Sequence, residues 1–131
     1  MSGLMPIPEH VNKYASEIVD AAYMIHRSLG PGLLEMVYHA CLAHELSSRR
    51  VPFESQVTLP IIYEGIRLDA GLRVDLWVDR CLIVELKAVE ALLPVHQAQL
   101  MTYLKLTGSR LGLLINFNVP VIREGIRRLA L

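Results

Sequence analysis

Three charged residues stand in two segments of the sequence that are otherwise apolar. Asp75 lies within Leu72–Val78, and Glu85 and Lys87 lie two residues apart within Leu82–Lys87. If both segments are β-strands, side chains alternate across them and all three charged residues share one face. The other face of the two strands is then apolar, and consists of Leu72, Val74, Leu76, Val78, Leu82, Val84 and Leu86. Charged side chains in strands this apolar need charged partners or a metal ion.

The length of the loop between these strands decides whether the two acidic residues meet. A two-residue loop sets Asp75 opposite Val84, whereas a three-residue loop over residues 79–81 sets it opposite Glu85. We predict the second register. When two carboxylates lie this close, the pKa of one of them is raised unless a cation lies between them. A site whose ligands are all oxygen atoms suits Mg²⁺ or Mn²⁺. Lys87, on the same face, is placed to hold a phosphate oxygen or a hydrolytic water.

Two helices are expected before these strands and one after them. Apolar residues recur at helical spacing in His10–Leu29 and Leu33–Ser48, and the glycine-rich turn at 30–32 separates the two segments. Pro94 and Gly108 bracket a third helix over Val95–Thr107.

Three or four strands are expected between the second and third helices. They lie in Phe53–Leu59, Ile61–Leu68, Leu72–Val78 and Leu82–Lys87. Leu111–Phe117 has the composition of a further buried strand, and Val121–Leu131 fits either a helix or an edge strand. We therefore predict an α/β fold: a mixed central sheet led by an antiparallel meander, with the N-terminal helices on one face and the third helix on the other.

Composition and charge limit the classes of function. The 131 residues fit a single domain, expected to span residues 1–131, and 53% of them are hydrophobic. This content excludes disorder and predicts a homo-oligomer, because so short a chain cannot bury all of its apolar surface. Thirteen basic and thirteen acidic residues cancel, so the chain lacks the global positive field of a typical nucleic-acid binder. Any binding to nucleic acid must be local.

The sequence gives no sign of export or of a membrane partner. Cys41 and Cys81 fit no disulfide framework, and the one Cys-x-x-His pair, Cys41 with His44, has no second pair to complete a zinc site. The first residues lack a basic region followed by a long apolar one, and the uncharged stretch Leu111–Ile122 is short and interrupted. We expect a cytoplasmic protein.

Several motifs then point to a known family. Asp75 followed by Glu85-Leu-Lys87 resembles the core of the PD-(D/E)XK nuclease superfamily, an Asp on one strand and Glu-x-Lys on the next. Gly32-Leu-Leu-Glu-Met-Val-Tyr38 is similar to the motif of the small bacterial GxxExxY proteins, and Gln99-x-x-x-Tyr103 to the QxxxY motif of the recombination-exonuclease branch.

The resemblance to the GxxExxY proteins is nearly full-length. It also covers Leu82–Ala88, Pro94–Lys105 and Leu111–Asn118. The sequence departs from the superfamily pattern at one point, because Val74 rather than proline precedes Asp75.

The resemblance implies a restriction-endonuclease-like core and a metal-dependent nuclease, with DNA as the expected substrate. Asp75, Glu85 and the backbone carbonyl of Leu86 would bind Mg²⁺ or Mn²⁺, and Lys87 would orient or activate water. Glu35 would be a further acidic ligand or hold a water. Gln99 and Tyr103, one helical turn apart, would brace the site or contact the substrate.

Each of these assignments has a structural alternative. The charged strand face fits a cross-strand salt-bridge ladder. Glu35 suits the first turn of a helix whatever its function, and Gln99 with Tyr103 could pack on the sheet as a surface pair. Gly32 could serve only as backbone punctuation, and Tyr38 is expected in the core.

A basic cluster and a second class of function remain open. Arg123, Arg127 and Arg128 form either a solvated face or a phosphate-binding patch that an oligomer would double. The small size and zero net charge also fit a non-catalytic binding or assembly module, or an enzyme that needs a protein partner for targeting.

Overall fold

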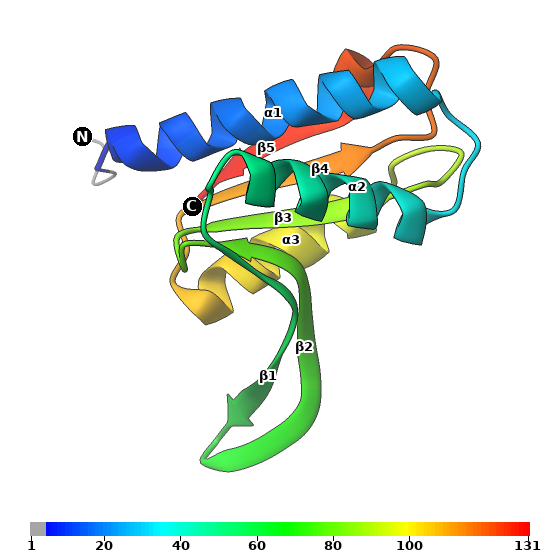
Figure 1. The fold of residues 1–131 in the computed structure, drawn as a ribbon. Coiled ribbons are helices and arrows are strands. Elements are labelled where there is room, and N and C mark those ends of the chain that lie inside the picture. Colours follow the sequence, from blue (N-terminus) through cyan, green and yellow to red (C-terminus); the bar gives the residue numbers. More distant parts are fainter. Residues whose placement is uncertain (1–4) are drawn as a thin grey trace.

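The structure, a computed structural model, describes residues 5–131 and folds them as three α-helices, one short 3₁₀ helix and five strands (Figure 1). The helices are α1 (Glu9–Leu29), α2 (Glu35–Ser48), α3 (Pro94–Thr107) and the 3₁₀ helix η1 (Ile122–Gly125). The strands are β1 (Phe53–Tyr63), β2 (Ile66–Val78), β3 (Leu82–Lys87), β4 (Leu111–Asn116) and β5 (Ile126–Ala130).

The strands form one mixed sheet in the order β1-β2-β3-β4-β5. Strands β1, β2 and β3 are an antiparallel meander, β3 and β4 are parallel, and β4 and β5 are antiparallel. Helix α3 makes the crossover between the two parallel strands, as parallel pairing requires. The predicted α/β class and the mixed sheet led by a meander are confirmed.

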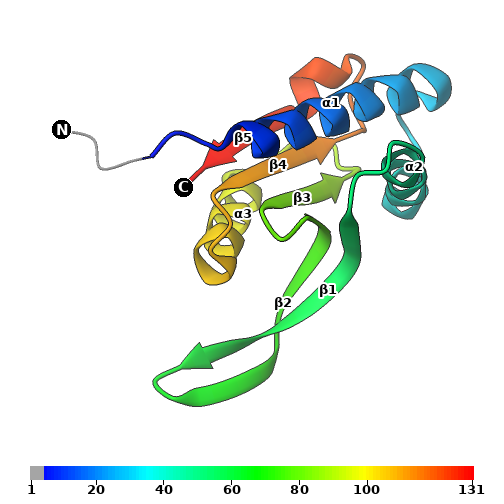
Figure 2. The ribbon, with the colours of Figure 1, turned by 60° about the vertical axis from the view of Figure 1, so that its left-hand side comes forward.

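The helices cover the two faces of the sheet, as predicted (Figures 1 and 2). The first core cluster joins α1 and α2 to the sheet; its members include Ile18, Leu42, Leu76, Val84 and Leu113. The second joins α3 to the other face; its members include Trp77, Ile83, Leu100, Leu104 and Leu114. Both acidic strand residues therefore lie in a sheet that is covered on both sides.

Arg49, just after α2, ties the two N-terminal helices together. Its guanidinium lies 3.1 Å from Glu17 and 2.8 Å from Asp20 on α1, and 3.3 Å from Glu45 on α2. These contacts hold α2 against α1 on the side away from the sheet-facing apolar residues.

A buried hydrogen bond joins the second cluster to the start of β4. The indole N–H of Trp77 donates to the hydroxyl oxygen of Ser109 at 3.0 Å, and both residues are buried. The bond satisfies an indole donor that would otherwise be unpaired beneath α3.

The hairpin formed by β1 and β2 corrects the prediction of four short strands. Residues 61–68 do not form one strand, because Glu64 and Gly65 adopt positive φ angles of 48° and 78° and make a tight turn. Two central residues with positive φ are typical of a type I′ hairpin turn. The ends of these two strands and the turn between them form an arm (residues 62–71) that projects from the body of the molecule (Figures 1 and 2).

The predicted apolar face of β2 is wrong in its first half. Leu76 and Val78 belong to the cluster under α1 and α2, but Leu72 and Val74 belong to the cluster under α3. The alternation therefore breaks at Asp75, which lies between the two pairs. Strict period two holds only while a strand stays flat in its ladder, and β2 is strongly curved between the sheet and the arm (Figure 1).

The C-terminal segment resolves the two readings of residues 121–131. A single turn of 3₁₀ helix is followed by β5, which pairs with β4 and forms one edge of the sheet. Within the described residues, no helix has both the length and the apolar character needed to cross a membrane.

Candidate active site

Asp75 and Glu85 meet where β2 separates from β3. Leu76 pairs with Val84 and Val78 with Leu82, which confirms the three-residue loop and makes Asp75 and Glu85 the next pair in the series. At this point side chains replace the backbone ladder. The N–H of Asp75 donates to Oε2 of Glu85 at 2.8 Å, and the N–H of Leu86 donates to Oδ2 of Asp75 at 2.9 Å.

This exchange fixes both carboxylates before any ion is bound. Each carboxylate accepts a main-chain N–H from the opposite strand and keeps its second oxygen for another partner. The two acidic side chains therefore bridge the gap that opens between the diverging strands.

Glu85 is the more buried of the pair, with 4% of its surface exposed. Burial, and then the neighbouring charge of Asp75, raises the pKa of Glu85 from 4.5 to about 8. The Asp75 amide and the charge of Lys87 act in the opposite direction. A cation between the carboxylates would favour the ionised form of Glu85, so the electrostatics of the pair suit a metal site.

Glu35 lies near the acidic pair on the side of the sheet that α2 covers. It is the first residue of α2, and burial and then the charge of Asp75 raise its pKa, while Lys87 and His39 lower it. Residues from α2, β2 and β3 therefore act on one another electrostatically.

Tyr38 explains why α2 begins where it does. Its side chain is fully buried and stacks on Phe117, with ring centroids 4.5 Å apart. Its hydroxyl donates to the carbonyl of Gly30 at 2.7 Å and accepts from the N–H of Leu33 at 3.1 Å. Gly32, in the same loop, has a φ of 97°, which favours glycine. The expectation that Tyr38 is a core residue is confirmed, and its hydroxyl holds the loop that aims Glu35.

The donor set fits a hard divalent cation. Asp75 and Glu85 offer carboxylate oxygens, and Mg²⁺ needs only one or two carboxylates because it keeps several waters. Among residues 5–131, no group of three or more His, Cys, Asp or Glu side chains is close enough to hold an ion. The pair is therefore the acidic centre of the site, and Glu35 lies outside its immediate coordination distance.

The salt-bridge ladder finds no support in the described part of the chain. Neither Asp75 nor Glu85 forms an ion pair there with a lysine or arginine. Lys87, half-buried at the end of β3, lowers the pKa of both Glu35 and Glu85. Its charge therefore acts on both glutamates, although it forms no ion pair with either of them in the described part of the chain.

Tyr103 lies near the acidic pair from the α3 side. Tyr103 is half-buried, and its pKa is raised by burial and then by the charges of Glu85 and Asp75. Gln99 is exposed one turn earlier on the same helix.

The predicted basic residues Arg127 and Arg128 lie elsewhere, on the edge strand β5. Strand β4 separates them from the acidic pair. Arg127 donates to the carbonyls of Glu124 and Ile126, at 2.7 and 3.1 Å, and Arg128 donates to the side chain of Asn12 on α1 at 2.5 Å. The structure does not bring these arginines to the acidic pair.

His39 is a site residue that the sequence analysis missed. Its Nε2 lies 3.2 Å from the carbonyl oxygen of Asp75 and 3.1 Å from the hydroxyl of Ser55. The available signal was its position four residues after Glu35, which places both side chains on one face of α2.

Comparison with known proteins gives a matching family and a similar fold. A family model described as the PD-(D/E)XK nuclease superfamily matches residues 12–129. The fold is similar to the crystal structure of SSO0001, with a TM-score of 0.56 and 20% sequence identity over 92% of this chain and 59% of that one. This chain therefore spans less than two thirds of SSO0001, and the likeness concerns the fold alone. No curated protein matches the chain.

Proposed function

The chain belongs to the PD-(D/E)XK nuclease superfamily, and from this premise we propose that it is a metal-dependent nuclease that hydrolyses the phosphodiester bonds of nucleic acid, with DNA as the expected substrate. The observation that carries the proposal is the meeting of Asp75 and Glu85 between β2 and β3, with Lys87 two residues further on. Within the superfamily, the motif from Gly32 to Tyr38 favours membership of the small GxxExxY proteins.

The acidic pair and the backbone carbonyl of Leu86 would hold Mg²⁺ or Mn²⁺. When bound, such an ion lowers the pKa of water and stabilises charge that develops on phosphate. Lys87 contributes a positive charge on the same side of the sheet, which favours the approach of a phosphodiester and orients the attacking water.

Three further side chains surround this centre in the proposal. Glu35 holds a water or a second ligand position from the α2 side, and Tyr103 braces the acidic pair from α3. Gln99, exposed on the same helix, contacts the substrate backbone. Arg127 and Arg128 contact phosphates beyond the cleavage point, because they lie across β4 from the acidic pair.

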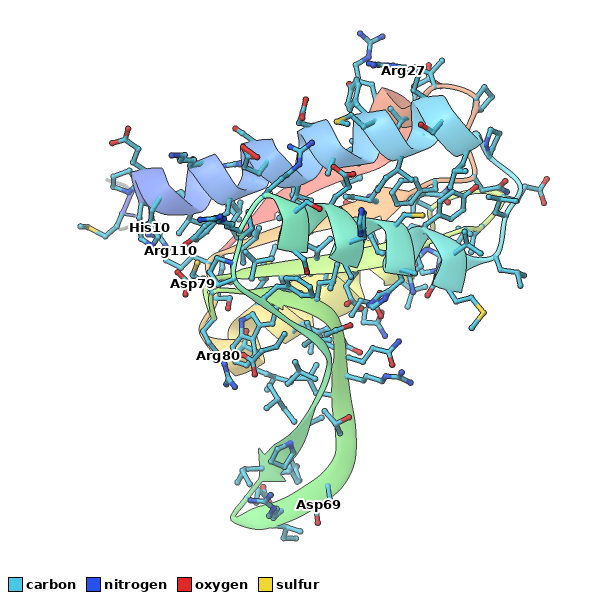
Figure 3. All side chains as sticks on the ribbon, viewed as in Figure 1. His10, Arg27, Asp69, Asp79, Arg80 and Arg110 are labelled. Carbon is cyan, nitrogen blue, oxygen red and sulfur yellow. The ribbon has the colours of Figure 1, made fainter. Side chains whose placement is uncertain are left out.

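A cleavage assay on mixed nucleic acids tests the function. Asp75→Asn keeps an acceptor for the Leu86 N–H but removes the charge, and Lys87→Met removes the cation. Both variants are expected to lose Mg²⁺- or Mn²⁺-dependent cleavage by at least about 100-fold. The matched control Asp69→Asn changes an exposed carboxylate on the arm, far from α1 and α2 (Figure 3), and is expected to cleave as wild type does. Cleavage that survives in Asp75→Asn, or that needs no metal, would rule out the proposal.

The arm is an exposed apolar surface that favours association, which also supports the alternative of an assembly module. Its exposed apolar side chains are Ile62, Tyr63, Ile66 and Leu68, with 48–63% of their surface accessible. Between residues 62 and 71 the charged residues are Glu64, Arg67 and Asp69, so the arm has a net charge of −1. This charge disfavours nucleic acid as the partner, and we propose that the arm binds a second copy of the chain.

Sedimentation measurements test self-association. The double variant Tyr63→Ser and Ile66→Ser is expected to shift wild-type oligomers toward monomers. A wild-type chain that is monomeric at all accessible concentrations would contradict the homo-oligomer. An assembly module without catalysis would retain the oligomer and show no cleavage, while a nuclease that is targeted by a protein partner would show both.

A further inference from the structure

We infer that His39 is a positioning residue that holds Asp75 in its site orientation, an inference that rests on the proposed function. His39 lies one turn after Glu35 on α2 and is half-buried. Its Nε2 is 3.2 Å from the carbonyl oxygen of Asp75. A carbonyl oxygen can only accept a hydrogen bond, so Nε2 carries the proton in this contact.

Asp75 needs such support because regular pairing is missing on both of its sides. Toward β1, Ser55 pairs with Leu76 and Val57 with Val74, but Gln56, which comes between Ser55 and Val57, is not paired with Asp75. Gln56 has a φ of 52°, which takes it out of the extended conformation. Toward β3, the ladder ends at the pair of Leu76 and Val84, one residue short of Asp75. The backbone of Asp75 therefore depends on side chains for its partners.

Three hydrogen bonds replace the missing ladder around Asp75. Its N–H binds the carboxylate of Glu85, its own carboxylate binds the N–H of Leu86, and its carbonyl binds His39. The first two bonds come from β3 and would move with that strand. The bond from His39 is the one that fixes Asp75 relative to α2, and thus relative to Glu35.

His39 also contacts the partner strand at the same irregular place. The hydroxyl oxygen of Ser55 lies 3.1 Å from the same Nε2, so with Nε2 protonated it is a second acceptor for the one N–H. One imidazole nitrogen on α2 therefore contacts both strands of the hairpin, β1 at Ser55 and β2 at Asp75. This geometry explains how the hairpin can curve away from the sheet while Asp75 stays directed at Glu85.

Three variants test the inference. His39→Leu removes the donor, His39→Gln retains an N–H donor on a side chain of similar reach, and His44→Leu changes an exposed histidine on the same helix as a matched control. The first readout is hydrogen exchange of the Leu86 amide in metal-free protein, because that amide is bound by the Asp75 carboxylate. The second readout is kcat and KM for cleavage at saturating metal.

We expect a defect in His39→Leu that is confined to the site. Exchange of the Leu86 amide should be about fivefold faster than in wild type, since a hydrogen bond contributes about 1 kcal/mol. The value of kcat should fall by about 10- to 100-fold, as for other residues that orient a ligand, with KM changed less than about threefold. His39→Gln should recover most of both losses, and His44→Leu should match wild type.

Each outcome bears on one proposal. Exchange at Leu86 and a kcat that are the same in His39→Leu and His44→Leu would overturn the positioning role. A general loss of protection that His39→Gln does not restore would overturn it as well, because His39 would then support the fold as a whole. If wild-type protein cleaves nothing in any metal, the proposed nuclease function fails, while the exchange comparison still decides whether His39 positions Asp75.

Discussion

Replacing Glu85 with glutamine removes a buried carboxyl group without removing its hydrogen-bond acceptor. Burial, and then the charge of Asp75, raises the pKa of Glu85 from 4.5 to about 8. The folded protein therefore holds this proton more tightly than the unfolded chain does. Between about pH 4.5 and pH 8 the folded state binds more protons, so the free energy of unfolding of wild type must fall as pH rises through this window.

The size of the effect follows from the width of the window. One pH unit corresponds to about 1.4 kcal/mol, so a pKa that moves from 4.5 to about 8 accounts for at most about 5 kcal/mol of stability. Glutamine has no proton to lose. At about pH 5 the free energies of unfolding of Glu85→Gln and wild type should agree within about 1 kcal/mol, and at about pH 8.5 the variant should be more stable by several kcal/mol.

Urea unfolding in the presence of a chelator, at a series of pH values, measures this difference. Glu90→Gln changes an exposed glutamate outside the site and should follow the wild-type curve. Adding Mg²⁺ at about pH 8.5 should stabilise wild type but not Glu85→Gln, by about 2.7 kcal/mol when the ion is at about 100 times its dissociation constant. Parallel pH curves for Glu85→Gln and wild type would refute the assignment of a strained, buried carboxylate.

Three further predictions concern the residues that hold the site in place. Tyr38→Phe leaves two backbone groups of the α1–α2 loop without their partner, so the free energy of unfolding in urea should fall by about 1–3 kcal/mol. The cleavage rate should fall as well, because the loop that positions Glu35 loses this support. Ser109→Ala leaves the buried indole N–H unpaired, should cost about 1–3 kcal/mol, and should shift the fluorescence of the single tryptophan. Arg49→Met keeps an apolar stem but removes three ion pairs. The free energy of unfolding should fall by about 1–2 kcal/mol at low salt and by less at high salt. A decrease that does not depend on salt would contradict the role of these pairs.

The helices and the key register could be predicted from the sequence because local signals determine them. The apolar periodicity of α1 and the Pro94 and Gly108 boundaries of α3 locate the helices to within one or two residues. The loop at residues 79–81 sets Asp75 opposite Glu85 through turn length alone, and Asp79 and Arg80 both adopt the positive φ angles of a tight turn. Helix boundaries and loop lengths depend on residues that are close in the sequence, so the sequence alone can predict them.

The remaining features depend on contacts between distant segments. The break in alternation at Asp75 arises because β2 leaves the ladder, and the hydrogen bonds that permit this come from β3 and α2. The role of His39 has the same origin, since no motif marks a histidine that binds a backbone carbonyl 36 residues away. The distance of the β5 arginines from the acidic pair also depends on strand order, because β4 lies between β5 and β3.

The acidic pair also has a structural role, so a substitution that removes its charge can disturb the fold as well. Where β2 and β3 diverge, the N–H groups of Asp75 and Leu86 would be left without partners, and unpaired backbone donors in a covered sheet are costly. The carboxylates of Asp75 and Glu85 satisfy both donors. Alanine at either position would therefore expose an unpaired N–H as well as remove a charge. Asparagine or glutamine keeps the acceptor, so the amide variants change the charge of the site while the divergence of the strands is preserved.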